Sequence, residues 1–170
     1  VHLKSDCMSC WSGIMHDAAS LTEGWERLVS GLTPVLDHAA EQGMVVGFEP
    51  EPGMFIDTMA KFDELQDRVG HPALKLTLDV GHLHCTGETP IPDCIRRYAD
   101  VLVNIHIEDM RAGVHEHLMF GDGEMEFGPI LASLKEIGYG EGLHVELSRH
   151  SHDGANAARR AMEFLAGFCV

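Results

Sequence analysis

Residues 73–82 read Ala-Leu-Lys-Leu-Thr-Leu-Asp-Val-Gly-His, and this stretch decides how the rest of the chain is interpreted. Three leucines alternate with Lys75, Thr77 and Asp79. Because successive side chains of a β-strand point to opposite faces, the alternation predicts a strand with one apolar face and one polar face. The polar face ends in the carboxylate of Asp79. We therefore expect helices to cover the apolar face, while the polar face meets a wet or metal-bearing interior.

The same alternation recurs elsewhere in the chain. His106 lies in the polar phase of the run 101–108, and Glu146 lies in the polar phase of the run 143–148. Five strand-like runs are predicted in all, at 1–5, 44–49, 73–80, 101–108 and 143–148.

Segments with helical periodicity separate these runs. Residues 21–39 carry apolar side chains at i, i+4 and i+7, which predicts an amphipathic helix with a kink at Pro34. Ser20 and Glu23 predict a capping box, and Gly43 lies where this helix would end. Further helices are predicted from Asp57 to Gly70, near Pro92, from Pro129 to Gly138 and after Asp153.

Repeated strand–helix units predict an α/β fold with a parallel sheet and helices outside it. Strands of an open sheet covered on both faces are continuously apolar, whereas these strands alternate, which favours a barrel with a polar interior. A complete (β/α)8 barrel needs eight units and about 250 residues. We therefore expect residues 1–170 to form a single domain, a partial (β/α)8 TIM barrel of about five C-terminal βα units. Its unpaired strand edges could pair with another chain to give a homo-oligomer.

Composition excludes several classes of protein. Twelve Lys and Arg against 27 Asp and Glu give a net charge of −15, which makes nucleic acid an unfavourable partner. The apolar runs are far shorter than the ~20 residues that cross a bilayer, so we expect no membrane association. Five cysteines are an odd number and indicate a reduced, cytoplasmic setting. Cys7 and Cys10 are predicted to be unpaired thiols in the loop after the first strand.

Metal-ligand residue types stand at or near the carboxyl ends of four successive predicted strands, where barrel active sites are built. These residues are Glu49, Asp79, His106 and Glu146. They are spaced about one strand–helix unit apart, so each would come from a different strand and converge on one point. Three carboxylates and one imidazole suit a divalent cation such as Mn²⁺, Mg²⁺ or Zn²⁺.

Three further histidines are candidates for the same region. His82 follows Asp79 by three residues and could be a ligand, a substrate contact or a surface histidine. His115 and His117 alternate in sequence, so they could share a face and bind a second metal, or lie in an exposed polar loop.

The stretch 109–128 is predicted to be the longest irregular loop. Within it, Gly121-Asp122-Gly123 is interpreted as a turn, since no Lys-Ser/Thr follows as in a phosphate loop. Asp109 at its start and Glu51 near Glu49 are carboxylates that could replace a primary ligand.

Five segments together carry a resemblance to a known superfamily, namely 47–50, 78–82, 104–109, 120–124 and 144–146. In this order they resemble the second half of the xylose-isomerase-like TIM barrels. That group includes sugar phosphate isomerases/epimerases, ketose 3-epimerases, inosose dehydratases and family-2 apurinic endonucleases. The resemblance covers nearly the whole chain.

The resemblance implies a divalent metal held by the residues that match the ligands of the family, Glu49, Asp79, His106 and Glu146. In the epimerase branch, Glu49 and Glu146 would be catalytic and would shuttle a proton beside the carbonyl of a carbohydrate substrate. His82 would contact the substrate. Arg111 lies near the place where the family often has an arginine for a distal hydroxyl or phosphate. These matches predict a metal-dependent sugar or sugar-phosphate isomerase or epimerase.

Two alternatives remain open. In the endonuclease branch, further zinc ions are held by the histidine after the aspartate, here His82, and by a later acid-x-His pair. His115 and His117 resemble that pair, with His115 in place of the acid, so a zinc-dependent AP endonuclease-like hydrolase is one alternative. The net charge of −15 speaks against it. The other alternative is an inactive barrel fragment that still binds metal.

Overall fold

The computed structural model describes residues 5, 7–15 and 20–168, and within them the chain divides into two compact units. Of the described residues, those up to Leu78 and those of Val101–Asn104 form the first unit, and those of Asp79–Asp100 and from Ile105 onward form the second. The strands of the main sheet follow the order β1-β2-β3-β4-β7. Strand–helix alternation in this order is the pattern of part of a (β/α)8 barrel, as the sequence predicts.

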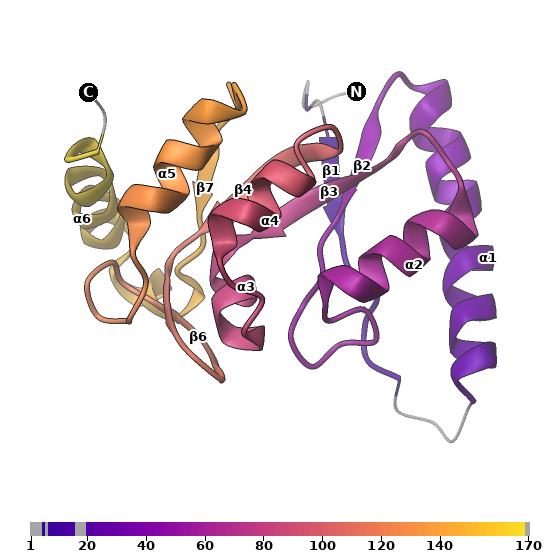
Figure 1. Cartoon of the computed structure of the whole chain (residues 1–170), viewed down its shortest axis with the longest axis horizontal. Coiled ribbons are helices and arrows are strands. Elements are labelled where there is room, and N and C mark those ends of the chain that lie inside the picture. Colours follow the sequence, from indigo (N-terminus) through magenta and orange to yellow (C-terminus); the bar gives the residue numbers. More distant parts are fainter. Residues whose placement is uncertain (1–4, 6, 16–19, 169–170) are drawn as a thin grey trace. The chain divides into compact units, whose positions relative to one another are not determined.

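The first unit is built from parallel strands and two long helices (Figure 1). Its elements are β1 (Cys7–Cys10), α1 (Leu21–Glu41), β2 (Val45–Phe48), α2 (Met59–Val69) and most of β3 (Leu74–Asp79). Val46 pairs with Leu74 and Phe48 with Leu76, so β2 and β3 run parallel. The Leu76 N–H donates to the Val101 carbonyl at 2.8 Å, which joins β3 to the start of β4 (Leu102–Ile107).

Local sequence explains where the two helices begin and end. In α1 the Ser20 hydroxyl accepts from the Glu23 N–H at 3.3 Å and the Glu23 carboxylate accepts from the Ser20 N–H at 2.7 Å, which confirms the capping box. The helix continues through Pro34. Thr58, and not Asp57, caps α2, because its hydroxyl accepts from the third N–H of the helix. Gly70 ends α2 in a left-handed conformation.

A layer of neutral polar side chains crosses the strands of the first unit. The hydroxyls of Ser9 on β1 and Thr77 on β3 lie 2.9 Å apart. The Asn104 amide on β4 donates to Ser9 at 3.3 Å and to Thr77 at 3.5 Å. Thr77 also donates to the Gly47 carbonyl on β2. The polar phase of the strands therefore forms an internal hydrogen-bonded layer, as expected for the inside of a barrel.

The second unit continues the strand–helix alternation. Its elements are α3 (Val80–Thr86), α4 (Ile91–Arg97), the end of β4, β5 (Asp109–Arg111), β6 (Val114–Leu118), α5 (Phe127–Glu136), β7 (Leu143–Val145), the 3-10 helix η1 (Ser148–Asp153) and α6 (Gly154–Ala166). Ile105 and Ile107 of β4 pair in parallel with Leu143 and Val145 of β7. The hairpin of β5 and β6 packs on α3, and α4 packs on α5 (Figure 1). No helix among the described residues is long and apolar enough to span a membrane.

Two local predictions are wrong, and a third, the strand at 1–5, is not tested. Cys7 and Cys10 lie in β1 and not in a loop, because the run from Cys7 to Cys10 lacks the β-branched residues that mark a strand. Both are reduced thiols, and in an extended strand residues three apart point to opposite faces. The strand predicted at 1–5 falls mostly outside the described residues. The stretch 109–128 is not an irregular loop but contains the hairpin β5–β6.

The sequence does not predict the short helix α3, which follows β3 directly, since it spans only seven residues and includes Gly81. In α5 the first residue is Phe127, so Pro129 stands third, in the first turn and near the predicted start. Proline is tolerated there because the first turn of a helix has no intrahelical partner for its N–H groups.

Candidate functional site

Asp79 ends β3 and begins α3, so one carboxylate serves two elements. Its Oδ1 accepts from the His82 N–H at 3.0 Å, which caps α3. Its Oδ2 is buried and accepts no hydrogen bond from the described residues, although His82 Nε2 lies 3.6 Å away. The residue as a whole is only 2% exposed. One oxygen therefore stabilises the helix, and the other is available to a ligand.

His106 and Glu146 form a close pair at the carboxyl ends of β4 and β7. His106 Nδ1 lies 3.0 Å from Glu146 Oε2. The hydrogen bond from His106 lowers the pKa of Glu146 and outweighs partial burial, which raises it. Electrostatic attraction to the imidazoles of His117, His106 and His82 lowers this pKa further. Glu146 is therefore ionised even in mildly acidic solution.

Asp79, His106 and Glu146 each offer a ligand atom, and these atoms lie within 4.8 Å of one another. Two carboxylates and an imidazole are a donor set that suits Mn²⁺, Zn²⁺ or Mg²⁺. The buried Oδ2 of Asp79 supports this fit, because a buried carboxylate oxygen is stable when it meets a cation. These three residues could therefore hold a divalent metal.

Glu49 belongs to the first unit, directly after β2. It is 3% exposed, and its N–H donates to the Cys10 carbonyl at 2.8 Å. Burial and the nearby charge of Glu49 raise the pKa of the Cys10 thiol to about 11. Glu49 as fourth ligand remains a prediction. Its neighbour Glu51, whose N–H donates to the Ile56 carbonyl at 3.0 Å, also lies in the first unit.

The three remaining candidate histidines come together within the second unit. His82 is on α3, while His115 and His117 lie on β6 and share one face of the strand. Their ligand atoms lie within 4.8 Å of one another, and the Nε2 atoms of His82 and His115 are 3.1 Å apart. Partial burial lowers the pKa of His115, and neighbouring His82 and His117 lower it further. We call these three residues the histidine cluster.

The residue between the two strand histidines points the other way. Glu116 Oε1 accepts from Arg149 Nη1 of η1 at 2.9 Å. Because side chains alternate along β6, this ion pair on one face leaves His115 and His117 on the other. Because His-Glu-His lies on a strand and not in a loop, its two histidines point in one direction and its glutamate in the other.

Asp109 does not act as a spare ligand. Its Oδ2 accepts from the N–H groups of Gly121 and Gly123 at 2.8 and 3.0 Å, and its Oδ1 accepts from Met110 and Met125 at 2.9 and 3.1 Å. The carboxylate holds the turn at 121–123 and has no oxygen left for a metal. The sequence-based suggestion that Asp109 could replace a ligand is therefore wrong, while the turn itself is confirmed.

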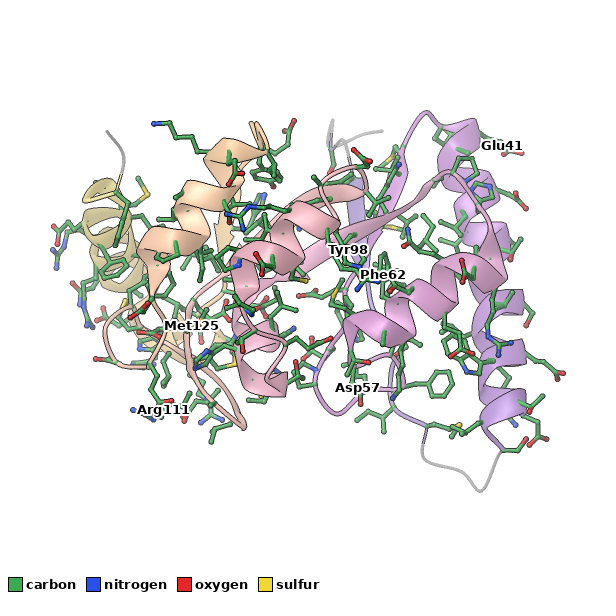
Figure 2. The ribbon with its side chains drawn as sticks, viewed as in Figure 1. Glu41, Asp57, Phe62, Tyr98, Arg111 and Met125 are labelled. Carbon is green, nitrogen blue, oxygen red and sulfur yellow. The ribbon has the colours of Figure 1, made fainter. Side chains whose placement is uncertain are left out.

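Arg111 is exposed on β5, and its guanidinium donates to the Asp122 carbonyl at 2.7 Å (Figure 2). Figure 2 labels the Arg111 side chain on the hairpin of the second unit. The contact that the structure gives Arg111 is thus with the turn at 121–123. Substrate binding by Arg111 and His82 stays a prediction.

Glu108 is a member of this region that the candidate residues from sequence did not include. It follows β4, is fully buried, and its Oε1 lies 3.8 Å from His117 Nδ1. Asp79, Glu108 and His117 also form a group whose ligand atoms lie within 4.8 Å. A signal existed in the sequence, because Glu108 continues the polar alternation that contains His106.

Several known proteins are similar to this chain in sequence or in fold. A 32% identical relative is the inosose dehydratase of Lacticaseibacillus casei, over 139 residues that cover 72% of this chain and 46% of the relative. The chain thus spans about half the length of this curated relative. A D-tagatose 3-epimerase-like protein has a TM-score of 0.80 at 22% identity, covering 98% of this chain and 64% of that one. The IOLI protein with a bound zinc atom has a TM-score of 0.77 at 20% identity, with 96% and 62% covered.

The family model for the xylose isomerase-like TIM barrel matches residues 1–168. This match spans both units, every described strand of the main sheet and every candidate ligand. Together with the strand order and the structural likeness, it confirms the partial barrel and the resemblance found in the sequence. The chain belongs to the xylose isomerase-like TIM barrel family.

Proposed function

We propose that this chain is the metal-binding part of an enzyme that moves a proton on the carbon next to a carbonyl of a sugar or a related polyhydroxylated ketone. The observation that carries the proposal is the contact of 3.0 Å between His106 Nδ1 and Glu146 Oε2 beside the buried Asp79, a contact that lowers the pKa of Glu146. Relatives named as an inosose dehydratase and a 3-epimerase-like protein support the class of substrate.

The proposed ligands are Asp79, His106 and Glu146, joined by Glu49. A bound divalent ion supplies positive charge that polarises the carbonyl and acidifies the neighbouring C–H. The zinc in the IOLI structure supports zinc among the candidate ions. Mn²⁺ and Mg²⁺ suit the same donors.

Glu146 is the residue that we propose removes the proton. A general base must be ionised and must lie within hydrogen-bond reach of the proton that it abstracts. The contact with His106 meets the first condition, because it lowers the pKa of Glu146, and it also fixes the direction of the carboxylate. Glu49 would return a proton from the opposite side in an epimerisation, or protonate a departing hydroxyl in a dehydration.

Deuterium exchange tests this proposal without knowledge of the final product. The protein is incubated in D₂O with an inosose or a ketohexose and with Mn²⁺, Mg²⁺ or Zn²⁺, and NMR follows loss of the C–H signal next to the carbonyl. Glu146→Gln should slow exchange by about 10²- to 10⁴-fold, the usual contribution of a general base. Glu116→Gln, with the same change of charge outside the site, should leave exchange unchanged. Undiminished exchange in Glu146→Gln would refute the role of Glu146.

The histidine cluster favours one second candidate function. Three imidazoles that converge at this distance could hold a second cation, and two-cation sites are common in phosphoester hydrolases. The net charge of −15 opposes a nucleic-acid substrate. An abasic-site oligonucleotide incubated with Zn²⁺ separates the two functions, because cleavage without deuterium exchange would identify a hydrolase. A cation-dependent shift in melting with neither activity would identify an inactive metal-binding fragment.

A further inference from the structure

We propose that Glu108 is a positioning residue for the histidine cluster: it orients the His117 ring and thereby sets the affinity of the cluster for a divalent cation. The inference rests on the proposed second cation site. Glu108 would not touch the cation itself, whereas the three histidines of the cluster would.

The fold reserves space for the Glu108 carboxylate. The side chain is fully buried between α3 and the hairpin. Gly81 of α3 faces it so closely that a Cβ at this position would collide with Glu108 Oε1, and would also lie 2.9 Å from Met110 Cε. Glycine is a poor helix former compared with alanine, so its presence in α3 calls for a reason. Glycine at position 81 is therefore explained by the carboxylate that it accommodates.

The carboxylate faces one particular atom of the cluster. Glu108 Oε1 lies 3.8 Å from Nδ1 of His117, and Nδ1 is buried. A shift of about 1 Å would make this a charge-assisted hydrogen bond of ordinary length. With the proton held on Nδ1, the lone pair of Nε2 is available to a cation.

A carboxylate behind a ligating histidine has two physical effects. It fixes which ring nitrogen carries the proton and makes the other nitrogen a stronger donor, and its loss usually weakens metal binding by 10- to 100-fold. The burial of Glu108 fits this role, because a buried carboxylate is stabilised by positive charge nearby. A cation held by His82, His115 and His117 would supply that charge across the imidazole.

Cobalt binding tests the inference, because Co²⁺ bound by imidazoles absorbs visible light. The part of the absorption that His115→Asn removes belongs to the histidine cluster. Glu108→Gln keeps the shape of the side chain and removes its charge, so the Kd of this part should rise by about 10- to 100-fold. Glu116→Gln is the matched control, one residue before His117 but paired with Arg149, and should change the Kd by no more than about threefold.

A second variant keeps the test valid if Glu108→Gln does not fold. Gly81→Ala leaves every charge in place but displaces the Glu108 carboxylate, so it should weaken the same absorption while circular dichroism remains unchanged. In the metal-free parent, ¹⁵N NMR of labelled histidine should find the His117 proton on Nδ1, and in Glu108→Gln the two ring forms should mix.

The outcomes separate the two proposals. If the absorption of the parent does not depend on His115, the cluster is not a cation site and the inference falls with it. If Glu108→Gln or Gly81→Ala binds Co²⁺ as tightly as the parent, or if Glu116→Gln weakens binding equally, Glu108 has no positioning role. None of these results depends on deuterium exchange at the Glu146 site.

Discussion

The interior polar groups of the two units differ in their charge and in their hydrogen bonding. In the first unit, Ser9, Thr77 and Asn104 are neutral and hydrogen-bond one another. In the second unit, the corresponding groups are carboxylates and imidazoles. Asp79 there keeps one buried oxygen outside any hydrogen bond among the described residues. Neutral groups that hydrogen-bond one another hold the strands together. A buried carboxylate oxygen without such a bond is a place where a ligand is expected.

The largest test of this contrast is the effect of a cation on melting. We expect Mn²⁺ or Zn²⁺ at about a hundredfold excess over its Kd to stabilise the parent by about 2.7 kcal/mol. The variant Glu49→Gln/Glu146→Gln should lose the part of the shift that belongs to this site, measured by differential scanning calorimetry, and any remainder should disappear when His115→Asn is added. Glu49→Gln alone shows whether the carboxylate of the first unit takes part. An undiminished shift in the double variant would show that the cation binds elsewhere.

A substitution in the neutral layer should lower the stability of the fold and leave the affinity for the cation unchanged. Asn104→Leu removes the amide that donates to Ser9 and Thr77 and leaves buried hydroxyls with fewer partners. We expect a loss of about 1–3 kcal/mol in the free energy of unfolding, measured with urea. The Kd for the cation should stay within error of the parent. A large change in that Kd would mean that the layer shapes the site and that the contrast is too simple.

The histidine cluster should make stability depend on pH. The pKa of His115 is lower in the folded chain than its ordinary value near 6.5, so the unfolded chain binds the proton first as pH falls. Stability should therefore be complete above about pH 7 and decline as pH falls through 6.5 toward the lowered value. His115→Asn should show a shallower decline in melting temperature between pH 7 and 5. Equal slopes in parent and variant would exclude His115 as the source.

The smallest effect concerns a thiol of the first unit. Because burial and the charge of Glu49 raise the pKa of Cys10 to about 11, this thiol is protonated at neutral pH and should react slowly with a disulfide reagent. Glu49→Gln lowers that pKa and should speed the reaction at pH 8. Cys85, whose pKa is raised by burial and then by Asp79, serves as an internal comparison that the substitution should leave unchanged. Unaltered kinetics would mean that burial alone controls Cys10.

The sequence predicted the parts of the fold that repeat. Strand alternation such as that of 73–80 and helical spacing such as that of 21–39 are long enough to be recognised, and both elements form. The sequence does not predict the hairpin β5–β6, because its strands are short and β6 has only two apolar residues, at its ends. The turn at 121–123 was found from its glycines, but its anchor was not, since nothing in sequence links Asp109 to N–H groups a dozen residues away.

The candidate site was predictable to a similar degree. Asp79, His106 and Glu146 were identified because the carboxyl ends of parallel strands gather at one edge, and the structure brings their ligand atoms together. The alternation of His115 and His117 already suggests a shared face in the sequence, and the structure adds that this face lies on a strand and meets His82 of α3. Glu108 was seen as part of a polar phase, yet only its complete burial against Gly81 distinguishes it from an ordinary strand residue.

The carboxylate of Asp109 has one more consequence, for how this protein can change over evolutionary time. The carboxylate accepts hydrogen bonds from four N–H groups, one just before the segment that carries His115 and His117 and three just after it. It therefore holds the two ends of this segment together. The exposed tip at Ala112 and Gly113 lies between these fastened ends. Lengthening a closed loop raises the entropic cost of closing it only slightly, by about 0.6 kcal/mol for each doubling of its length. Insertions at this tip could therefore add new contacts to a substrate while the histidines keep their places.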